Sequence, residues 1–254
     1  MSRSAGKAMS EIAKNLSKVR DRIAHAIKNR PICYDSVNVR LVAVGKTKPS
    51  SQIQDAYNAG QRNFGENYVN ELVEKSRDDV LNEACPDIKW HFIGHLQSNK
   101  VNKITTIPNL YMIETIDSEK LANAVNKSWQ RVEAKDALNV MVQVNTSGED
   151  QKSGINPSEA HKLVDHIRQN CPSLMFKGLM TIGAMNYDLT LGPNPDFQQL
   201  IQCRKNVAEK LGLNELDIEL SMGMSNDFEH AIENGSSNIR VGSTIFGARQ
   251  YNTT

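Results

Sequence analysis

Short apolar runs alternate with amphipathic segments along this chain, and the two kinds of segment predict strands and helices in turn. The runs 41–44 and 140–144 are almost entirely apolar, which is typical of parallel strands covered on both faces. Strands are predicted over Leu41–Lys46, Asn63–Glu66, Lys89–Gly94, Leu110–Thr115, Asn139–Asn145, Phe176–Ile182, Asp217–Gly223 and Asn238–Thr244. Helices are predicted between them over Ser50–Ala59, Tyr68–Asn82, Ser98–Thr105, Ser118–Gln130, Pro157–Gln169, Phe197–Leu211 and Asn226–Asn234. This alternation predicts an α/β protein with a single (β/α)8 TIM-type barrel, a fold of roughly 250 residues.

An additional helix is expected before the first strand, within residues 1–30. Ile12, Leu16, Val19, Ile23 and Ile27 recur at spacings of three and four, which predicts one buried stripe. The same segment has a basic excess that also occurs in organelle transit peptides, but such peptides avoid acidic residues and this segment contains two. We therefore favour an amphipathic helix and a cytoplasmic protein, with a mitochondrial location left open.

The composition and charge of the chain argue against several classes of function. The 30 basic and 29 acidic side chains leave a formal charge of +1, so the chain lacks the basic field of a dedicated nucleic-acid binder. No apolar run approaches the roughly 20 residues that cross a bilayer, so no membrane partner is expected. The four cysteines lie far apart, which argues against a disulfide framework or a zinc site. No Pro-, Ser- or Gly-rich linker divides the chain, so one domain over residues 1–254 is expected.

In a barrel of this kind, function lies where strands end and helices begin. Lys46 is the first candidate, because it alternates with Val42 and Val44 and shares their face of the strand. If the valines point into the barrel, the lysine would lose hydration and favour the neutral amine that forms an imine. The alternative is a strand-end lysine that reaches solvent, which we expect for Lys48.

The last two strand-to-helix loops suggest anion binding. Ser221–Ser225 precedes a predicted helix, and Arg240–Thr244 contains Gly242 with the hydroxyl residue Ser243 next to it. Free backbone N–H groups at such positions attract phosphate, and phosphate sites after strands seven and eight recur in this fold. Ordinary helix capping is the alternative. Arg240 should face the barrel mouth and needs an acceptor there.

Other polar residues are weaker candidates. His91 and His95 do not share a helical face, so a structural role is favoured over metal binding. The acids Glu66 and Glu114 end strands, but hydrolysis by paired carboxylates needs a fixed separation that spacing does not reveal. The polar loop 148–154 is interpreted as a mobile lid.

Six motifs together resemble one known family. They are Val44-Gly-Lys-Thr-Lys-Pro49, Phe64-Gly-Glu-Asn-Tyr68, Trp90-His-Phe-Ile-Gly-His-Leu-Gln97, Gly178-Leu-Met-Thr181, Leu220-Ser-Met-Gly-Met-Ser225 and Arg240-Val-Gly-Ser-Thr-Ile-Phe-Gly-Ala-Arg249. In this order they are similar to the pyridoxal 5'-phosphate homeostasis proteins, which resemble the N-terminal barrel of alanine racemase. The likeness runs from about Lys46 to Arg249. Gly45 and Ser243 depart from it, because the family often has Ser and Thr there.

The resemblance implies a cofactor, pyridoxal 5'-phosphate (PLP), in a fold type III barrel. It implies that Lys46 holds PLP as an aldimine, that Ser225, Gly242 and Ser243 hold its phosphate, and that Arg240 faces the pyridine nitrogen. Met224 and Asn67 would line the ring; these two roles come from the resemblance alone.

The favoured function is a non-catalytic, monomeric protein that holds PLP for vitamin B6 homeostasis and delivers it to apo-enzymes that use it. An arginine at the pyridine nitrogen weakens the ring as an electron sink. Related racemases also take a tyrosine from an extra β domain, for which the barrel leaves no room in this sequence. The alternatives are a PLP-dependent racemase or lyase, and a phosphosugar barrel with Lys46 as an aldolase lysine.

Overall fold

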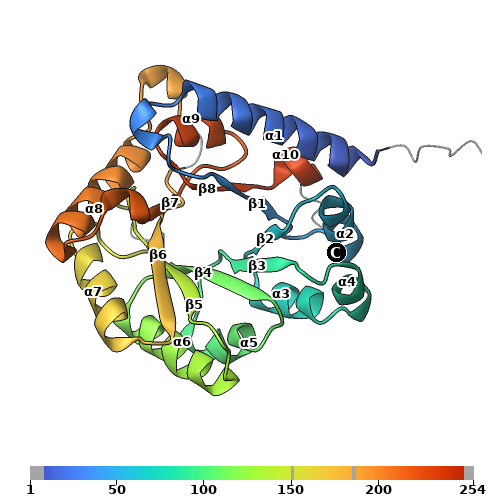
Figure 1. Ribbon diagram of the computed structural model, residues 1–254, viewed down its shortest axis with the longest axis horizontal. Helices are drawn as coiled ribbons and strands as arrows, with labels where there is room; N and C mark the ends of the chain where they lie inside the picture. Colours follow the sequence, from blue (N-terminus) through green and yellow to red (C-terminus); the bar gives the residue numbers. More distant parts are fainter. Residues whose placement is uncertain (1–8, 150–151, 185–186, 249–254) are drawn as a thin grey trace, which may run out of the picture.

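Eight parallel strands close into one barrel in the order of the chain, with β8 pairing back to β1 (Figure 1). The structure is a computed structural model, and it describes residues 9–149, 152–184 and 187–248. The strands are β1 (Arg40–Val44), β2 (Asn63–Glu66), β3 (Lys89–Phe92), β4 (Leu110–Ile116), β5 (Leu138–Gln143), β6 (Leu174–Met180), β7 (Glu219–Ser221) and β8 (Asn238–Val241). The predicted (β/α)8 fold is confirmed.

The helices form a ring outside the strands (Figure 1). They are α1 (Glu11–Asn29), α2 (Ser50–Asn58), α3 (Val69–Ser76), α4 (Asp79–Ala84), α5 (Val101–Thr105), α6 (Glu119–Val132), α7 (Ala160–Asn170), α8 (Pro195–Leu211), α9 (Phe228–Glu233) and α10 (Ser243–Phe246). Short 3₁₀ turns are η1 (Ile32–Tyr34), η2 (Ser98–Lys100), η3 (Leu189–Leu191) and η4 (Glu215–Asp217).

Several predicted elements have different boundaries in the structure, and the first, fifth and sixth strands each end two residues earlier than predicted. The predicted helix 68–82 is two helices, because the Asp78 side chain accepts the N–H groups of Val80 and Leu81 and so begins α4. The seventh strand is shorter than predicted, since Asp217 is the last residue of η4 and β7 covers only Glu219–Ser221. The eighth strand ends at Val241, and Ser243 begins α10.

The N-terminal helix is confirmed over Glu11–Asn29, and residues 1–8 lie outside the described ranges. Ser10 caps it by accepting the N–H of Ala13. Its apolar stripe is buried against α2, α9 and α10, so α1 covers the side of the barrel where β8 meets β1 (Figure 1).

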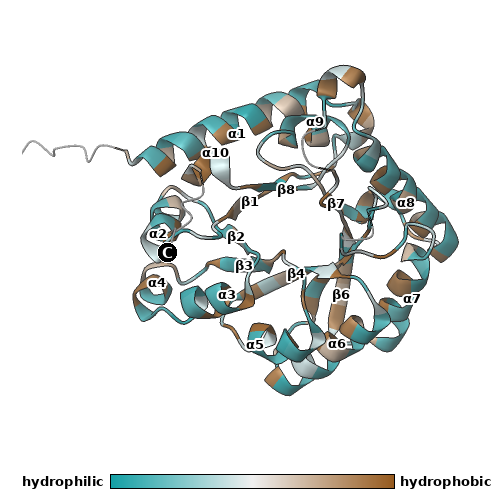
Figure 2. Cartoon of the chain, turned by 180° about the vertical axis from the view of Figure 1, so that it is seen from behind, coloured by the Kyte–Doolittle hydropathy of each residue, from teal (hydrophilic) through white to brown (hydrophobic). Residues whose placement is uncertain are grey.

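Most of the apolar core lies between the strands and the surrounding helices, whose outer faces are largely hydrophilic (Figure 2). The barrel interior is different. It contains a small cluster of Met112, Met141 and Met180, with a buried polar network beside it.

Glu114 is at the centre of this network. Its carboxylate accepts hydrogen bonds from Ser221 Oγ (2.6 Å) and Asn238 Nδ2 (3.0 Å), and it lies 2.7 Å from His91 Nδ1. Burial alone would raise the pKa of Glu114, but the hydrogen bond from His91 and the charges of His91 and Arg240 lower it to about 2. The interior of the barrel therefore holds a carboxylate directly below the mouth.

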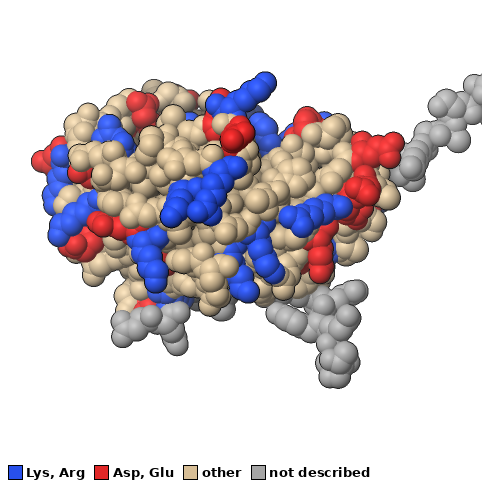
Figure 3. All heavy atoms as spheres, turned by 90° about the horizontal axis from the view of Figure 1, so that it is seen from below, with Lys and Arg blue, Asp and Glu red and all other residues tan. Residues whose placement is uncertain are grey.

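Basic and acidic side chains are interspersed on the face shown in Figure 3, in keeping with the near-neutral charge of the chain. In the described part of the chain, every helix is too short or too polar to cross a membrane.

Candidate functional site

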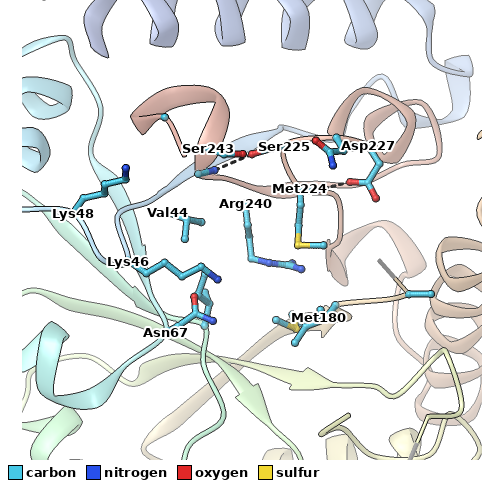
Figure 4. Close-up of a pocket in the computed structure, with 16 residues that line it drawn as sticks. Val44, Lys46, Lys48, Asn67, Met180, Met224, Ser225, Asp227, Arg240 and Ser243 are labelled. Atoms are coloured by element: carbon cyan, nitrogen blue, oxygen red, sulfur yellow. Dashed lines mark hydrogen bonds between the residues drawn. The ribbon is translucent and has the colours of Figure 1, made fainter. Parts of the chain in front are cut away.

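A cavity of about 310 Å³ opens at the carboxyl ends of the strands (Figure 4). It is lined by Val44, Lys46, Lys48, Asn67, Ile93, Met180, Ile182, Ala184, Met224, Ser225, Asn226, Asp227, Arg240, Gly242, Ser243 and Gly247. All seven residues singled out from the sequence as cofactor-binding are in this set: Lys46, Asn67, Met224, Ser225, Arg240, Gly242 and Ser243. The fold therefore brings together residues that are almost 200 positions apart in the sequence, from Lys46 to Ser243.

Lys46 lies in the turn that follows β1, because β1 ends at Val44, two residues before the predicted strand end at Lys46. The turn is formed by hydrogen bonds from Gly45 N to Gly65 O (3.0 Å) and from Lys48 N to Gly45 O (3.0 Å). The side chains of Val44 and Lys46 both line the cavity. The strand pattern, in which every second side chain faces the same side, therefore continues into the turn. In Figure 4 the amine of Lys46 extends into the cavity beside Asn67.

Asn67 follows β2 and has a buried side-chain oxygen, Oδ1, without a hydrogen-bond partner among the described residues. Its backbone is packed tightly against Gly94, where a Cβ would lie 1.9 Å from Asn67 O. Gly94 is therefore needed for this close approach. The side-chain amide of Asn67 therefore has unused hydrogen-bonding capacity at the edge of the cavity.

The loop after β7 turns back on itself at Met224–Asp227. Met224 N donates to Asp227 Oδ1 (2.6 Å), and Phe228 N donates to Met224 O (2.9 Å). The helix predicted over Asn226–Asn234 begins two residues later than expected. The helix begins at Phe228, because the Asp227 carboxylate closes the preceding turn.

The loop after β8 meets this turn through Ser225, whose Oγ accepts the N–H of Gly242 (3.2 Å; Figure 4). Gly242 lies close to the first strand, since a Cβ there would be 3.2 Å from Val44 O. Ser243 begins α10, and the N–H groups of a first helical turn have no partner within the helix. The two loops thus join hydroxyl and backbone donors at one end of the cavity.

Arg240 lies at the floor of the cavity and is 4% exposed. Its guanidinium donates to Ser221 Oγ (2.5 Å) and to Thr181 O (2.7 Å). Burial lowers the pKa of Arg240, and the charges of Glu114 and Asp227 act in the opposite direction. The predicted orientation toward the barrel mouth is confirmed, and the acceptors it needs are Ser221 on β7 and Thr181 just after β6.

The weaker candidates have other roles. Glu66 and Glu114 lie on opposite faces of the sheet, since Glu66 contacts Lys75 of α3 while Glu114 contacts residues across the barrel interior. They therefore do not form a pair of carboxylates around one substrate. His91 is buried beside Glu114, whereas His95 is exposed. Among the described residues, no group of three or more His, Cys, Asp or Glu side chains could hold a metal ion.

Two sequence interpretations concern the rim of the cavity. Lys48 was expected to be solvated; it is partly exposed at the cavity, and its Nζ donates to Ala248 O (2.7 Å). The predicted lid 148–154 includes residues 150–151, which lie outside the described ranges. The described Lys152 donates to Gly183 O (2.9 Å), which connects this loop with the end of the sixth strand.

Sequence reasoning missed several lining residues, chiefly Ile93, Met180, Ile182, Ala184 and Asp227. Met180 could have been found by alternation along the predicted strand 176–182, because it shares a face with Ile182, which also lines the cavity. Asp227 is the acceptor of a turn, and an Asp in a loop before a helix is a recognisable signal for that role.

Comparisons with known proteins give a consistent result. The family described as "Alanine racemase, N-terminal domain" matches residues 10–250. The pyridoxal phosphate homeostasis protein of Mus musculus is 55% identical over 236 residues, which are 93% of this chain and 86% of that protein. The Homo sapiens protein of the same name is 54% identical over equal shares. PipY of Synechococcus elongatus PCC7942, solved with PLP bound, has 29% identity and a TM-score of 0.75, with 93% of this chain and 100% of PipY covered.

Proposed function

Because this chain belongs to the pyridoxal phosphate homeostasis protein family, whose barrel is of the alanine racemase N-terminal type, we propose that it binds PLP in the cavity. We further propose that it holds PLP covalently through Lys46 and serves intracellular vitamin B6 homeostasis and delivery. The observation that supports this most is the convergence in one cavity of an amine (Lys46), a guanidinium (Arg240) and a hydroxyl-amide cluster (Ser225 with Gly242).

The residues present fit this group. A cavity of about 310 Å³ is within the range of small-ligand sites. The side-chain amide of Asn67 lines the cavity with its oxygen unpaired among the described residues, and its Nδ2 group would donate to an oxygen of PLP. When bound, PLP supplies an aldehyde for condensation with a primary amine and a ring that withdraws electrons.

The residues at the two ends of the cavity would contact different parts of PLP. The Ser225 hydroxyl already accepts from Gly242 N, so its own hydrogen remains available to a phosphate oxygen. Ser243 would add donors from the first turn of α10. Arg240, held by Ser221 and Thr181, would present its remaining N–H groups to the pyridine nitrogen. Met224 and Asn67 would flank the ring.

Arg240 also favours a protein that binds PLP without catalysing a reaction over a PLP-dependent enzyme. A guanidinium donates a hydrogen bond but does not give up its proton, so the pyridine nitrogen stays unprotonated and the ring is a weaker electron sink. A PLP-dependent amino-acid racemase or lyase is the second candidate, favoured by the match to the alanine racemase domain.

The first test is the absorption spectrum of the purified protein with PLP, followed by intact mass after borohydride reduction. Wild type and Lys48→Ala should give a visible band and a covalent pyridoxyl-phosphate adduct, and Lys46→Ala should give neither. Lys48 is the matched control, because it lines the same cavity two residues away. Absence of an adduct in wild type would overturn the proposal.

The second test separates holding from catalysis. The PLP-loaded protein is incubated with amino acids in deuterated water, and exchange of the α-proton is followed by NMR. We expect no exchange above that of free PLP; robust exchange would favour the racemase.

A further inference from the structure

A buried group of charged side chains contacts the turn that carries Lys46 from the side opposite the cavity. It consists of Glu66 on β2 with Glu71 and Lys75 on α3, and we call it the α3 charge cluster. Lys75 Nζ donates to Glu66 Oε1 (2.7 Å) and to Glu71 Oε1 (2.8 Å). None of the three residues lines the cavity. The cluster can therefore influence a ligand only indirectly, through the residues it contacts and through its charges.

The cluster binds the backbone on both sides of Lys46. Lys75 Nζ donates to the carbonyl oxygen of Gly45 (2.8 Å), and Glu71 Oε1 accepts the N–H of Thr47 (2.6 Å). The peptide groups before and after Lys46 are thus both held by side chains of α3. Because Lys75 is 7% exposed and also bonds both carboxylates, its own position is well determined.

Thr47 has a backbone conformation that needs such support. Its φ is 64°, in the left-handed region, which is unfavourable for a β-branched residue. Strained conformations of this kind persist when surrounding contacts over-determine them. The hydrogen bond from Thr47 N to Glu71 is such a contact, and it sets the direction in which the chain leaves Lys46.

From these contacts we propose that Glu71 and Lys75 are positioning residues for Lys46. They hold its amine in the cavity at the place where it meets the aldehyde. The inference rests on the proposed function. In the reaction the amine nitrogen attacks the aldehyde carbon, a C=N bond forms, the C=O bond breaks, and its oxygen leaves as water. No oxidation or reduction is involved.

The test compares Glu71→Ala with Glu71→Gln. Both variants lose the negative charge, but glutamine retains a side-chain oxygen that accepts from Thr47 N, and alanine does not. Glu71 is 21% exposed, so both should fold. If Glu71→Ala fails to fold, Glu71→Asp is used instead. The aspartate side chain is one methylene shorter, so its carboxylate does not reach Thr47 N.

The apo-protein is mixed with PLP, and the borohydride-trapped adduct is followed over time by intact mass. We expect Glu71→Ala to form it about 10 to 100 times more slowly than wild type, since a displacement near 1 Å has effects of that size. Glu71→Gln should stay close to wild type. Hydrogen exchange of the Thr47 amide should accelerate in the alanine variant alone, which reports on the turn without PLP.

The outcomes are distinct. If wild type forms no Lys46 adduct, the proposed function and this inference both fall. If wild type forms it and Glu71→Ala does so at the same rate, only the positioning role is overturned. Equal slowing in the alanine and glutamine variants also overturns it, because charge rather than the hydrogen bond to Thr47 would then matter.

Discussion

Replacing Glu66 by glutamine should make the protein more stable at pH 8 and change its stability little near pH 4.5. Glu66 is fully buried on β2, and its Oε2 has no hydrogen-bond partner among the described residues. Burial raises its pKa from 4.5 to about 7, even though Lys75 and, more weakly, Lys46 act in the opposite direction and Glu71 adds to the rise. The ionised form of Glu66 is therefore less favourable in the folded protein than in water.

The size of the effect follows from linkage. The pKa of Glu66 is raised by folding, so the folded protein binds this proton more tightly than the unfolded chain. The stabilisation is fully present below pH 4.5 and is lost as the pH rises to about 7. A difference of about 2.5 between the two pKa values corresponds to on the order of 3 kcal/mol, because one pKa unit is worth about 1.36 kcal/mol.

Glutamine has the shape of a protonated Glu66 and retains an oxygen for Lys75, but it does not titrate. We expect Glu66→Gln to be within about 1 kcal/mol of wild type at pH 4.5 and more stable by up to about 3 kcal/mol at pH 8. The assay is urea unfolding of both proteins at the two pH values, with Glu83→Gln on the exposed face of α4 as the matched loss of one charge. The reasoning is refuted if the difference between Glu66→Gln and wild type does not change with pH.

Three further predictions concern the barrel interior and the cavity. Glu114 has a pKa lowered to about 2, so in urea unfolding wild type should lose on the order of 3 kcal/mol more than Glu114→Gln as the pH falls from 4.5 toward 2. Gly94→Ala should lower the melting temperature and weaken PLP binding, because its Cβ would lie 1.9 Å from Asn67 O; a melting curve and a titration matching wild type would contradict this. Ser225→Ala should weaken PLP binding about tenfold by removing a hydroxyl and leaving Gly242 N without its acceptor, measured by fluorescence titration against a Cys33→Ala control far from the cavity.

The strands and the orientation of the chief site residues could be predicted because both depend on local alternation. A side chain two positions beyond a barrel-facing valine also faces the barrel, which placed Lys46, and the same rule placed Arg240 between Ile239 and Val241. The closed order of the strands then follows from the fold class, and it brings the seventh and eighth loops together.

Features that depend on contacts between distant segments could not be predicted. The hydrogen bond from Lys75 to Gly45 O requires the register of α3 against β1, which nothing within either segment specifies. The break in the predicted helix 68–82 was different, since Asp78 is a recognisable cap and the apolar periodicity obscured it. The roles of Asn67 and Met224 were accessible only through resemblance, because an amide or a thioether in a loop has no distinctive pattern.

The pairing of β1 with β8 has a consequence for the order in which the protein is made. Lys46 follows the first strand and Ser243 follows the last, so during synthesis the amine exists long before the opposite end of the cavity emerges from the ribosome. In the nascent chain only Lys46 is available to a ligand, whereas the finished barrel contains both ends of the cavity. A ligand that spans the β1–β8 junction therefore binds only the closed barrel, and by mass action it holds the first and last strands together.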